Sequence, residues 1–340
     1  MADNKEKLQW QAEFPEEDTG EEERLRRKWE RQQELKNAQR EKRLREQKQK
    51  LRAIMILSCV LLVLIILVSV LIVNVIIPFA RYQKANRLME DGLYAEAIIA
   101  FRNMPGYRDA DQLLEAAIRG QAVKLSGKED VRYETTDSAP WFTITEQGEL
   151  KFDEKKYTGD WQNVIVPDVF DGILVTALAE KAFAHCDKLL GVTISDCVLT
   201  LSKYAFLSCD GITEIVLPTH LTLIDVSAFE ACSNLSKITF GNEISVIGAS
   251  AFAYCDRFVS LTLPASVKEL GSRSFNGCSA LESVTLGASV EKIGSYAFSA
   301  CTALKTILFQ GTSAEWSTLV SNPSRIGLSD VTVVKFDTAH

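Results

Sequence analysis

The sequence of 340 residues predicts a solenoid of short parallel β-strands, preceded by a single transmembrane α-helix and a small α-helical hairpin. Two observations support this prediction. Apolar residues recur every 23 residues through the second half of the chain, and the first half contains a run of 25 residues without any charge. Nucleic acid is not expected as a partner, because 45 acidic against 38 basic residues give a net charge of −7.

The first 52 residues are polar throughout. We expect disorder over residues 1–16 and a solvated helix over residues 17–52, since Glu, Arg, Lys and Gln favour helix and form ion pairs at spacings of three and four. A dimeric coiled coil is the weaker alternative, because the few apolar residues in this stretch do not keep a heptad register.

A transmembrane helix is predicted over residues 53–77, where 22 of 25 residues are apolar. At 1.5 Å per residue, a helix of this length reaches about 37 Å, which exceeds the roughly 30 Å of a hydrocarbon core. A signal peptide fits less well, because the run begins after 50 residues and no small-residue cleavage site precedes Pro78. A buried core helix would show a polar stripe over such a length.

The basic residues around this run predict its orientation. Eight lie in the 20 residues before Ala53, and three lie in the 20 residues after Pro78. Because basic flanks stay in the cytoplasm, we expect a cytoplasmic N-terminus and an extracellular C-terminal region. We also expect the apolar run and its basic flank to contact membrane lipid.

Residues 78–126 are expected to form a helical stalk. Apolar residues recur there at helical spacing with breaks at Gly92 and at Pro105-Gly106, which resembles one tetratricopeptide-like hairpin followed by a further helix. A peptide-binding array of such hairpins needs about three repeats to bury its apolar faces, so a spacer is the preferred interpretation. The polar residues 127–140 are expected to be a linker.

The repeat occupies residues 175–312, between an N-terminal cap at 141–174 and a C-terminal cap at 313–340. Its six units share a phenylalanine, followed three residues later by a cysteine: Phe183, Phe206, Phe229, Phe252, Phe275 and Phe298, then Cys186, Cys209, Cys232, Cys255, Cys278 and Cys301. Each unit continues as Leu-x-x-Ile-x-Leu, and this pattern at a period of about 20–29 residues is typical of a leucine-rich-repeat solenoid. No unit can cover its own apolar side chains, so we expect stacking into one parallel sheet with a continuous core. Tight turns are expected at three glycines, Gly248, Gly271 and Gly294.

The full unit reads Ile-Gly-x-x-Ala-Phe-x-x-Cys-x-x-Leu-x-x-Ile-x-Leu-Pro, and it is nearly complete around Gly248, with Phe258 in place of the leucine. This unit resembles the repeat of the BspA-like, or treponemal-type, leucine-rich-repeat family. An opening piece at 141–176 and a closing piece that begins at Phe309 also match, so the resemblance covers about residues 141–338. It implies a bacterial surface or secreted protein that binds host or neighbouring-cell proteins, and it leaves the partner open.

The six cysteines of the repeat are expected to be buried thiols rather than disulfides. Equivalent side chains on stacked coils are parallel and about 4.8 Å apart, beyond the usual Cβ separation of roughly 3.5–4.5 Å in a disulfide. No metal or cofactor site is predicted, because the chain lacks a Cys-x-x-Cys pair and has only three histidines, His185, His220 and His340. A phosphate-binding glycine loop and a nucleophile motif are also lacking, so no enzymatic activity is expected.

The strand positions that point outward form the candidate ligand face. Small polar residues dominate this face, which comprises Thr193, Glu214, Lys237, Thr239, Thr262 and Thr285. Three tyrosines on the flanking turns are alternative anchors: Tyr204, Tyr254 and Tyr296. An equally good interpretation is that threonine suits an exposed strand without any ligand.

These features predict a single-pass protein of the cell membrane whose extracellular solenoid binds another protein or a cell-wall component. A structural envelope spacer without a dedicated ligand is one alternative. A transmembrane receptor that signals through the cytoplasmic residues 1–52 is the other.

Overall fold

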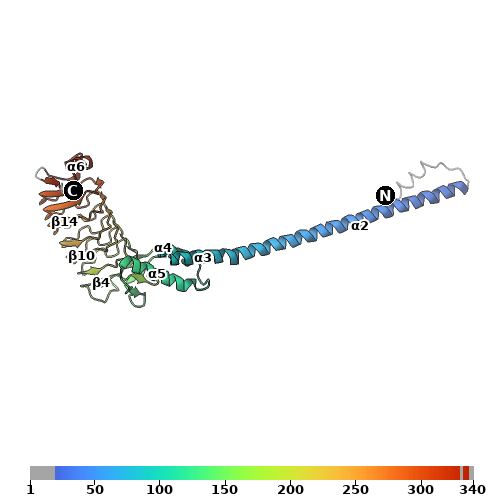
Figure 1. The fold of residues 1–340 in the computed structure, drawn as a ribbon, viewed down its shortest axis with the longest axis horizontal. Coiled ribbons are helices and arrows are strands. Elements are labelled where there is room, and N and C mark those ends of the chain that lie inside the picture. Colours follow the sequence, from blue (N-terminus) through green and yellow to red (C-terminus); the bar gives the residue numbers. More distant parts are fainter. Residues whose placement is uncertain (1–19, 330–331, 337–340) are drawn as a thin grey trace. The chain divides into compact units, whose positions relative to one another are not determined.

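The computed structural model describes residues 20–329 and 332–336. The disorder expected for residues 1–16 lies outside this part of the chain. Two compact units divide after Ala80, and each is described by itself (Figure 1).

The first unit is a single long helix. Helix α2 (Gly20–Leu71) is followed without a break by a π-helical turn, η1 (Ile72–Ile76), and by the start of α3 (Ile77–Glu90). The polar and apolar parts of the sequence therefore share one helix. Ion pairs four residues apart support its polar part, with 3.3 Å between nitrogen and oxygen in Arg27–Glu23 and in Arg45–Glu41.

The apolar run continues past Pro78, where the sequence had suggested the end of the helix. Proline lacks an N–H and crowds the carbonyl one turn earlier, which normally kinks or ends a helix. Here the N–H of Ile77 bonds to the carbonyl of Ile72, five residues back, in the turn that precedes the proline. The wider π turn makes room for the ring, so the helix continues to Glu90.

The second unit begins with a small helical module. It contains the rest of α3, together with α4 (Tyr94–Arg102) and α5 (Ala110–Ser126). Its buried residues pack against Val169, Leu174 and Cys197 of the solenoid. The expected spacer stalk is thus packed onto the first coils, because its apolar faces find partners there.

Residues 127–140, expected to be a linker, differ from that expectation. Strand β1 (Tyr133–Glu134) pairs with β5 (Val169–Phe170), which in turn pairs with β6 (Ile173–Leu174). The Asp168 carboxylate accepts a hydrogen bond of 2.7 Å from the N–H of Arg132. These bonds make the segment part of the first coil.

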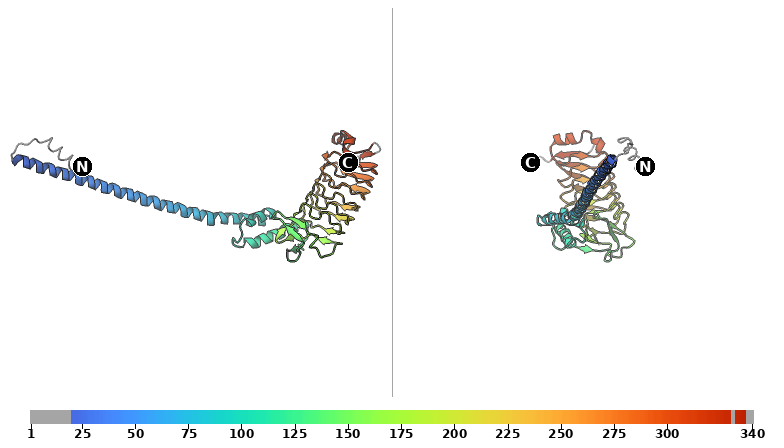
Figure 2. Two further views of the ribbon diagram at one scale, coloured as in Figure 1. Left: turned by 180° about the vertical axis from the view of Figure 1, so that it is seen from behind. Right: turned by 90° about the vertical axis from the view of Figure 1, so that its right-hand side faces the viewer.

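The expected Ile-x-Leu strands are present and pair in parallel with residues 23 apart (Figure 2). They are β8 (Val192–Thr193), β10 (Glu214–Val216), β12 (Lys237–Thr239), β14 (Ser260–Thr262), β16 (Ser283–Gly287) and β18 (Thr306–Gln310). Strand β4 (Val164–Ile165) precedes them, and β19 (Val333–Phe336) follows them. This side of the solenoid consists of three short parallel sheets, β4–β8, β10–β12 and β14–β16–β18–β19.

A second and longer sheet corrects the prediction of one sheet. Its parallel strands are two residues long except at the N-terminal end: β3 (Glu149–Phe152), β7 (Ala177–Leu178), β9 (Thr200–Leu201), β11 (Leu223–Ile224), β13 (Val246–Ile247), β15 (Glu269–Leu270) and β17 (Lys292–Ile293). Strand β2 (Phe142–Ile144) closes that end by an antiparallel pair with β3. At the other end lie α6 (Ser313–Leu319), a 3₁₀ turn η2 (Pro323–Ile326) and β19. Each complete coil therefore supplies a strand to both sides of a β-solenoid with a 23-residue repeat.

The six phenylalanines of the repeat form a continuous column of parallel rings between the two sheets. Neighbouring ring centroids are 5.0–5.7 Å apart, and the ring planes differ by 2–8°. All six rings are buried, which confirms that they fill the inner wall of the coil.

The cysteine column lies beside these rings. Five of its six thiols are buried, as predicted, and Cys301 at the C-terminal end is partly exposed. The buried thiol of Cys209 donates to the carbonyl of Phe183 in the preceding coil at 2.9 Å, and Cys255 donates to Phe229 in the same way at 3.2 Å. Burial raises the pKa of Cys232 to about 12, so this thiol stays neutral in the folded protein.

The repeated glycines serve close approach rather than tight turns. A Cβ at Gly248 would lie 2.6 Å from the carbonyl carbon of Asp225, and one at Gly294 would lie 2.3 Å from the backbone nitrogen of Ser272. Neither glycine has a left-handed backbone. The left-handed positions fall on other residues of the coil, such as Ser250 with φ 54°.

Candidate ligand-binding surface

The structure places the predicted ligand face on one side of the solenoid. Glu214 is directly opposite Lys237 in the β10–β12 pair, and Thr262 is opposite Thr285 in the β14–β16 pair. Thr193 and Thr239 lie on β8 and β12 and are exposed. The predicted column geometry is therefore confirmed, whereas binding at this face stays a prediction.

Side chains on this face are bonded to one another. The ammonium of Lys237 lies 3.3 Å from the carboxylate of Glu214, and the hydroxyl of Thr193 donates to Asn163 at 2.8 Å. Both members of the ion pair are about 70% exposed, with side-chain values of 72% and 68%, so the pair adds little stability. It does cancel the two charges that had distinguished this face.

The three candidate tyrosines do not form one site. Tyr204 and Tyr296 occupy the same position of coils four repeats apart, which separates them by about 19 Å. Each ring lies under a cation, with Lys181 5.6 Å from the centroid of Tyr204 and Arg273 5.8 Å from that of Tyr296. Tyr254 covers a glycine of the next coil.

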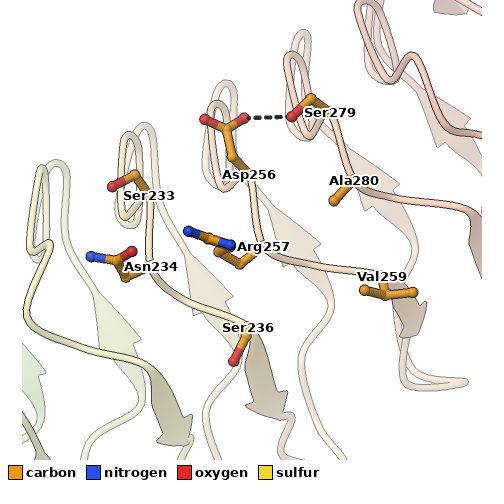
Figure 3. A pocket seen from close by; sticks show the side chains of 8 residues that line it. All are labelled: Ser233, Asn234, Ser236, Asp256, Arg257, Val259, Ser279 and Ala280. Atoms are coloured by element: carbon orange, nitrogen blue, oxygen red, sulfur yellow. Dashed lines mark hydrogen bonds between the residues drawn. The ribbon is translucent and has the colours of Figure 1, made fainter.

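A groove on the solenoid lies beside the predicted face. It has a volume of about 560 Å³ and crosses the loops that lead from the cysteine column into β12, β14 and β16 (Figure 3). Its lining residues are Ser233, Asn234, Ser236, Asp256, Arg257, Val259, Ser279 and Ala280. The sequence analysis did not identify this groove, because its positions hold different residues in successive coils.

Arg257 gives the groove its distinct chemistry. Its side chain reaches toward Asn234 of the preceding coil (Figure 3). Asp256 accepts a hydrogen bond of 3.3 Å from the hydroxyl of Ser279. Within the part of the chain that the structure describes, the guanidinium of Arg257 has neither an ion pair nor a hydrogen bond. Beside it, Val259 is 56% exposed.

Metal-ligating groups are dispersed over the described residues, where no three His, Cys, Asp or Glu side chains gather at a spacing that would hold an ion. His220 lies with its Nδ1 2.9 Å from a carboxylate oxygen of Glu243. His185 lies at a turn with φ 60°, next to the buried Cys186.

Comparison with known proteins identifies the repeat. The family model for the BspA type leucine rich repeat region matches in six copies, over residues 169–279 and 224–319. No curated protein matches the chain at the required significance.

Three solved structures are similar to the solenoid. The T. pallidum Leucine Rich Repeat protein (TpLRR) is 31% identical, with 49% of this chain and 81% of that chain covered and a TM-score of 0.44. A leucine-rich repeat protein from Bacteroides ovatus is 26% identical over 49% and 45% of the two chains, with a TM-score of 0.43. A leucine rich cell surface protein from Faecalibacterium prausnitzii is 25% identical over 49% and 52%, with a TM-score of 0.37.

The chain thus spans most of the first of these proteins and about half the length of the other two. The six matched copies coincide with the coils that carry the phenylalanine and cysteine columns. From these matches, the chain belongs to the BspA-type leucine-rich repeat proteins.

Proposed function

We propose that this chain is a single-pass membrane protein that presents its solenoid outside the cell for binding to another protein. Proteins of this repeat family are typically binding proteins rather than enzymes. The relative from F. prausnitzii is named a cell surface protein. Both facts support a role in recognition at the cell surface.

The exposed apolar helix supports the membrane anchor. In the described part of the chain, one helix is long and apolar enough to cross a membrane, by its length and composition. Its apolar side chains have no protein cover, as shown by Leu57, which is 73% exposed. A hydrocarbon core would cover them, and the excess of basic residues before Ala53 favours a cytoplasmic N-terminus.

The groove around Arg257 is the single observation that carries the binding role. Arginine and apolar side chains are common anchors in protein interfaces, and a guanidinium without a partner gains most from a carboxylate. The hydroxyl and amide groups around it supply further donors and acceptors. We therefore place the ligand contact here, with an acidic side chain of the ligand paired to Arg257.

Binding by the full-length protein in lipid nanodiscs tests this proposal. Purified surface proteins and cell-wall fragments are screened against the wild type, and hits are remeasured with two arginine variants. Arg257→Ala should weaken a specific ligand about tenfold or more. Arg273→Ala is the matched control, because Arg273 is exposed and already lies over the Tyr296 ring.

Other outcomes identify the alternatives. A loss of binding with Lys237→Ala but not with Arg257→Ala would move the site to the strand face. Absence of any ligand in the screen would favour the structural spacer.

Protease added to intact cells tests the topology. It should remove a C-terminal tag and spare an N-terminal tag. Protection of the C-terminal tag would refute the orientation.

A further inference from the structure

A second groove lies in the helical module, between α3 and α4. It has a volume of about 660 Å³ and lies entirely within the second unit. Helix α3 lines it with Arg81, Lys84 and Leu88, and helix α4 lines it with Glu96, Ile99, Ala100 and Asn103. The spacings of three and four residues show that each helix contributes one stripe of its surface.

Charges of both signs line this groove without forming pairs. Arg81, Lys84 and Glu96 are exposed, and none belongs to an ion pair with another residue that the structure describes. The exposed charges of the solenoid behave differently, as in Lys292 and Glu269, whose atoms lie 2.6 Å apart. Two free cations and one free carboxylate therefore meet in one concave surface.

An apolar surface accompanies these charges. Ile99 is 63% exposed, although its neighbours Ile98 and Phe101 are 8% and 1% exposed. Leu88 and Ala100 are half-buried beside it. A ligand that fits this groove must carry an anion, a cation and apolar groups within a short distance.

We propose that this groove binds a phospholipid headgroup that carries a phosphate and a primary amine. The phosphate accepts hydrogen bonds from Arg81 and Lys84, whose charges it neutralises. The ammonium donates to the carboxylate of Glu96, which a choline group without N–H cannot do. The glycerol and upper methylenes of the lipid contact Ile99 and Leu88.

The position of the groove along α3 matches the depth of such a headgroup. This inference rests on the membrane anchor of the proposed function. Arg81 follows Ile77 by four residues, or about 6 Å of helix, and Lys84 follows it by about 10 Å. The headgroup layer extends roughly 5–8 Å beyond each side of the hydrocarbon core. An apolar run that ends at the hydrocarbon boundary thus brings Arg81 to the level of the phosphates.

Lipid retention by the full-length protein tests the inference. The protein is inserted into nanodiscs with equal amounts of phosphatidylethanolamine, phosphatidylglycerol and phosphatidylcholine, then released and analysed for bound lipid by native mass spectrometry. The wild type should retain phosphatidylethanolamine preferentially. Arg81→Gln and Lys84→Gln should each lower this retention about tenfold, since each removes a charge-assisted hydrogen bond.

Two further variants separate the groove from general attraction to lipid. Arg87→Gln is the matched control, because Arg87 is exposed on the same helix but does not line the groove. Its retention should equal that of the wild type, and circular dichroism should be unchanged for all variants. Glu96→Gln should abolish the preference for phosphatidylethanolamine over phosphatidylglycerol, because it removes the partner of the amine.

The remaining outcomes overturn the inference in different ways. Equal retention of the three lipids, or an equal loss with Arg87→Gln, would show that the groove does not select a headgroup. Displacement of the lipid by millimolar inorganic phosphate would assign the groove to free phosphate. Failure of the protein to enter nanodiscs would refute the anchor itself, whereas loss of ligand binding by Arg257→Ala leaves lipid retention unaffected.

Discussion

Ser274 departs from the repeat inside the core, and its replacement by alanine should stabilise the protein. Its side chain is fully buried, and its hydroxyl oxygen has no hydrogen-bond partner in the structure. The other five coils have alanine at this position, and all five are buried: Ala182, Ala205, Ala228, Ala251 and Ala297. The fold thus accepts alanine here without rearrangement.

The expected magnitude follows from the lost hydration of the hydroxyl. A buried polar group without a partner costs about 1–3 kcal/mol relative to a satisfied one. Ser274→Ala removes only the oxygen and keeps the Cβ, so no apolar contact is lost. We expect the free energy of unfolding to rise by about 1–2 kcal/mol and the melting temperature to rise by about 2–8 °C.

Urea unfolding of the full-length protein, followed by tryptophan fluorescence, measures this change. The reverse substitution in the preceding coil, Ala251→Ser, is the matched control and should destabilise the protein by a similar amount. A lower stability of Ser274→Ala, or no effect of Ala251→Ser, would refute the argument, because the coil would then be shown to satisfy a hydroxyl at this position.

Three further predictions concern the two columns. Phe252→Ala removes a ring that stacks on Phe229 and Phe275 at 5.2 and 5.4 Å, so it should cost about 3–5 kcal/mol and weaken hydrogen-exchange protection in the coils on both sides; unchanged protection would contradict the stacked core. Stability should fall as the pH rises above about 8.5, because burial raises the pKa of the thiols and they ionise only in the unfolded chain; Cys255→Ala should reduce the slope of stability against pH by about 1.4 kcal/mol per pH unit in urea titrations near pH 10. Within the column, iodoacetamide should modify Cys301 first, because it is partly exposed and the contact with the Cys278 thiol lowers its pKa; mass spectrometry that finds equal rates would contradict this order.

The phenylalanine and cysteine columns were predictable because every coil imposes the same requirement on them. The second sheet was not, since most of its strands are two residues long and include polar residues such as Thr200 and Glu269. Two residues are too few for an alternating pattern. Its signal was the apolar residue that recurs near the start of each unit, which alone does not specify a strand.

Contacts between coils could be partly inferred from the period. Glu214 and Lys237 are 23 residues apart, so stacking in register brings them together, and the structure shows their ion pair. The contact of α5 with the solenoid had no such signal. Cys197 lies outside the cysteine column, and its thiol donates to the carbonyl of Ala122 at 3.7 Å. No feature of the sequence pairs these two residues.

Departures from the repeat indicate where this solenoid does more than stack. Residues shared by all coils are used by the neighbouring coils, because no coil is stable alone. Charges at matching positions pair between coils, as in Lys305 and Glu282 at 3.4 Å, and leave little for a ligand. Arg257 has no such partner, and it precedes Phe258, which replaces the usual leucine and packs its ring against Phe252 at 6.1 Å. A rigid buried ring directly beneath a free cation is the arrangement that a preformed binding site requires, and in this solenoid it occurs at the groove.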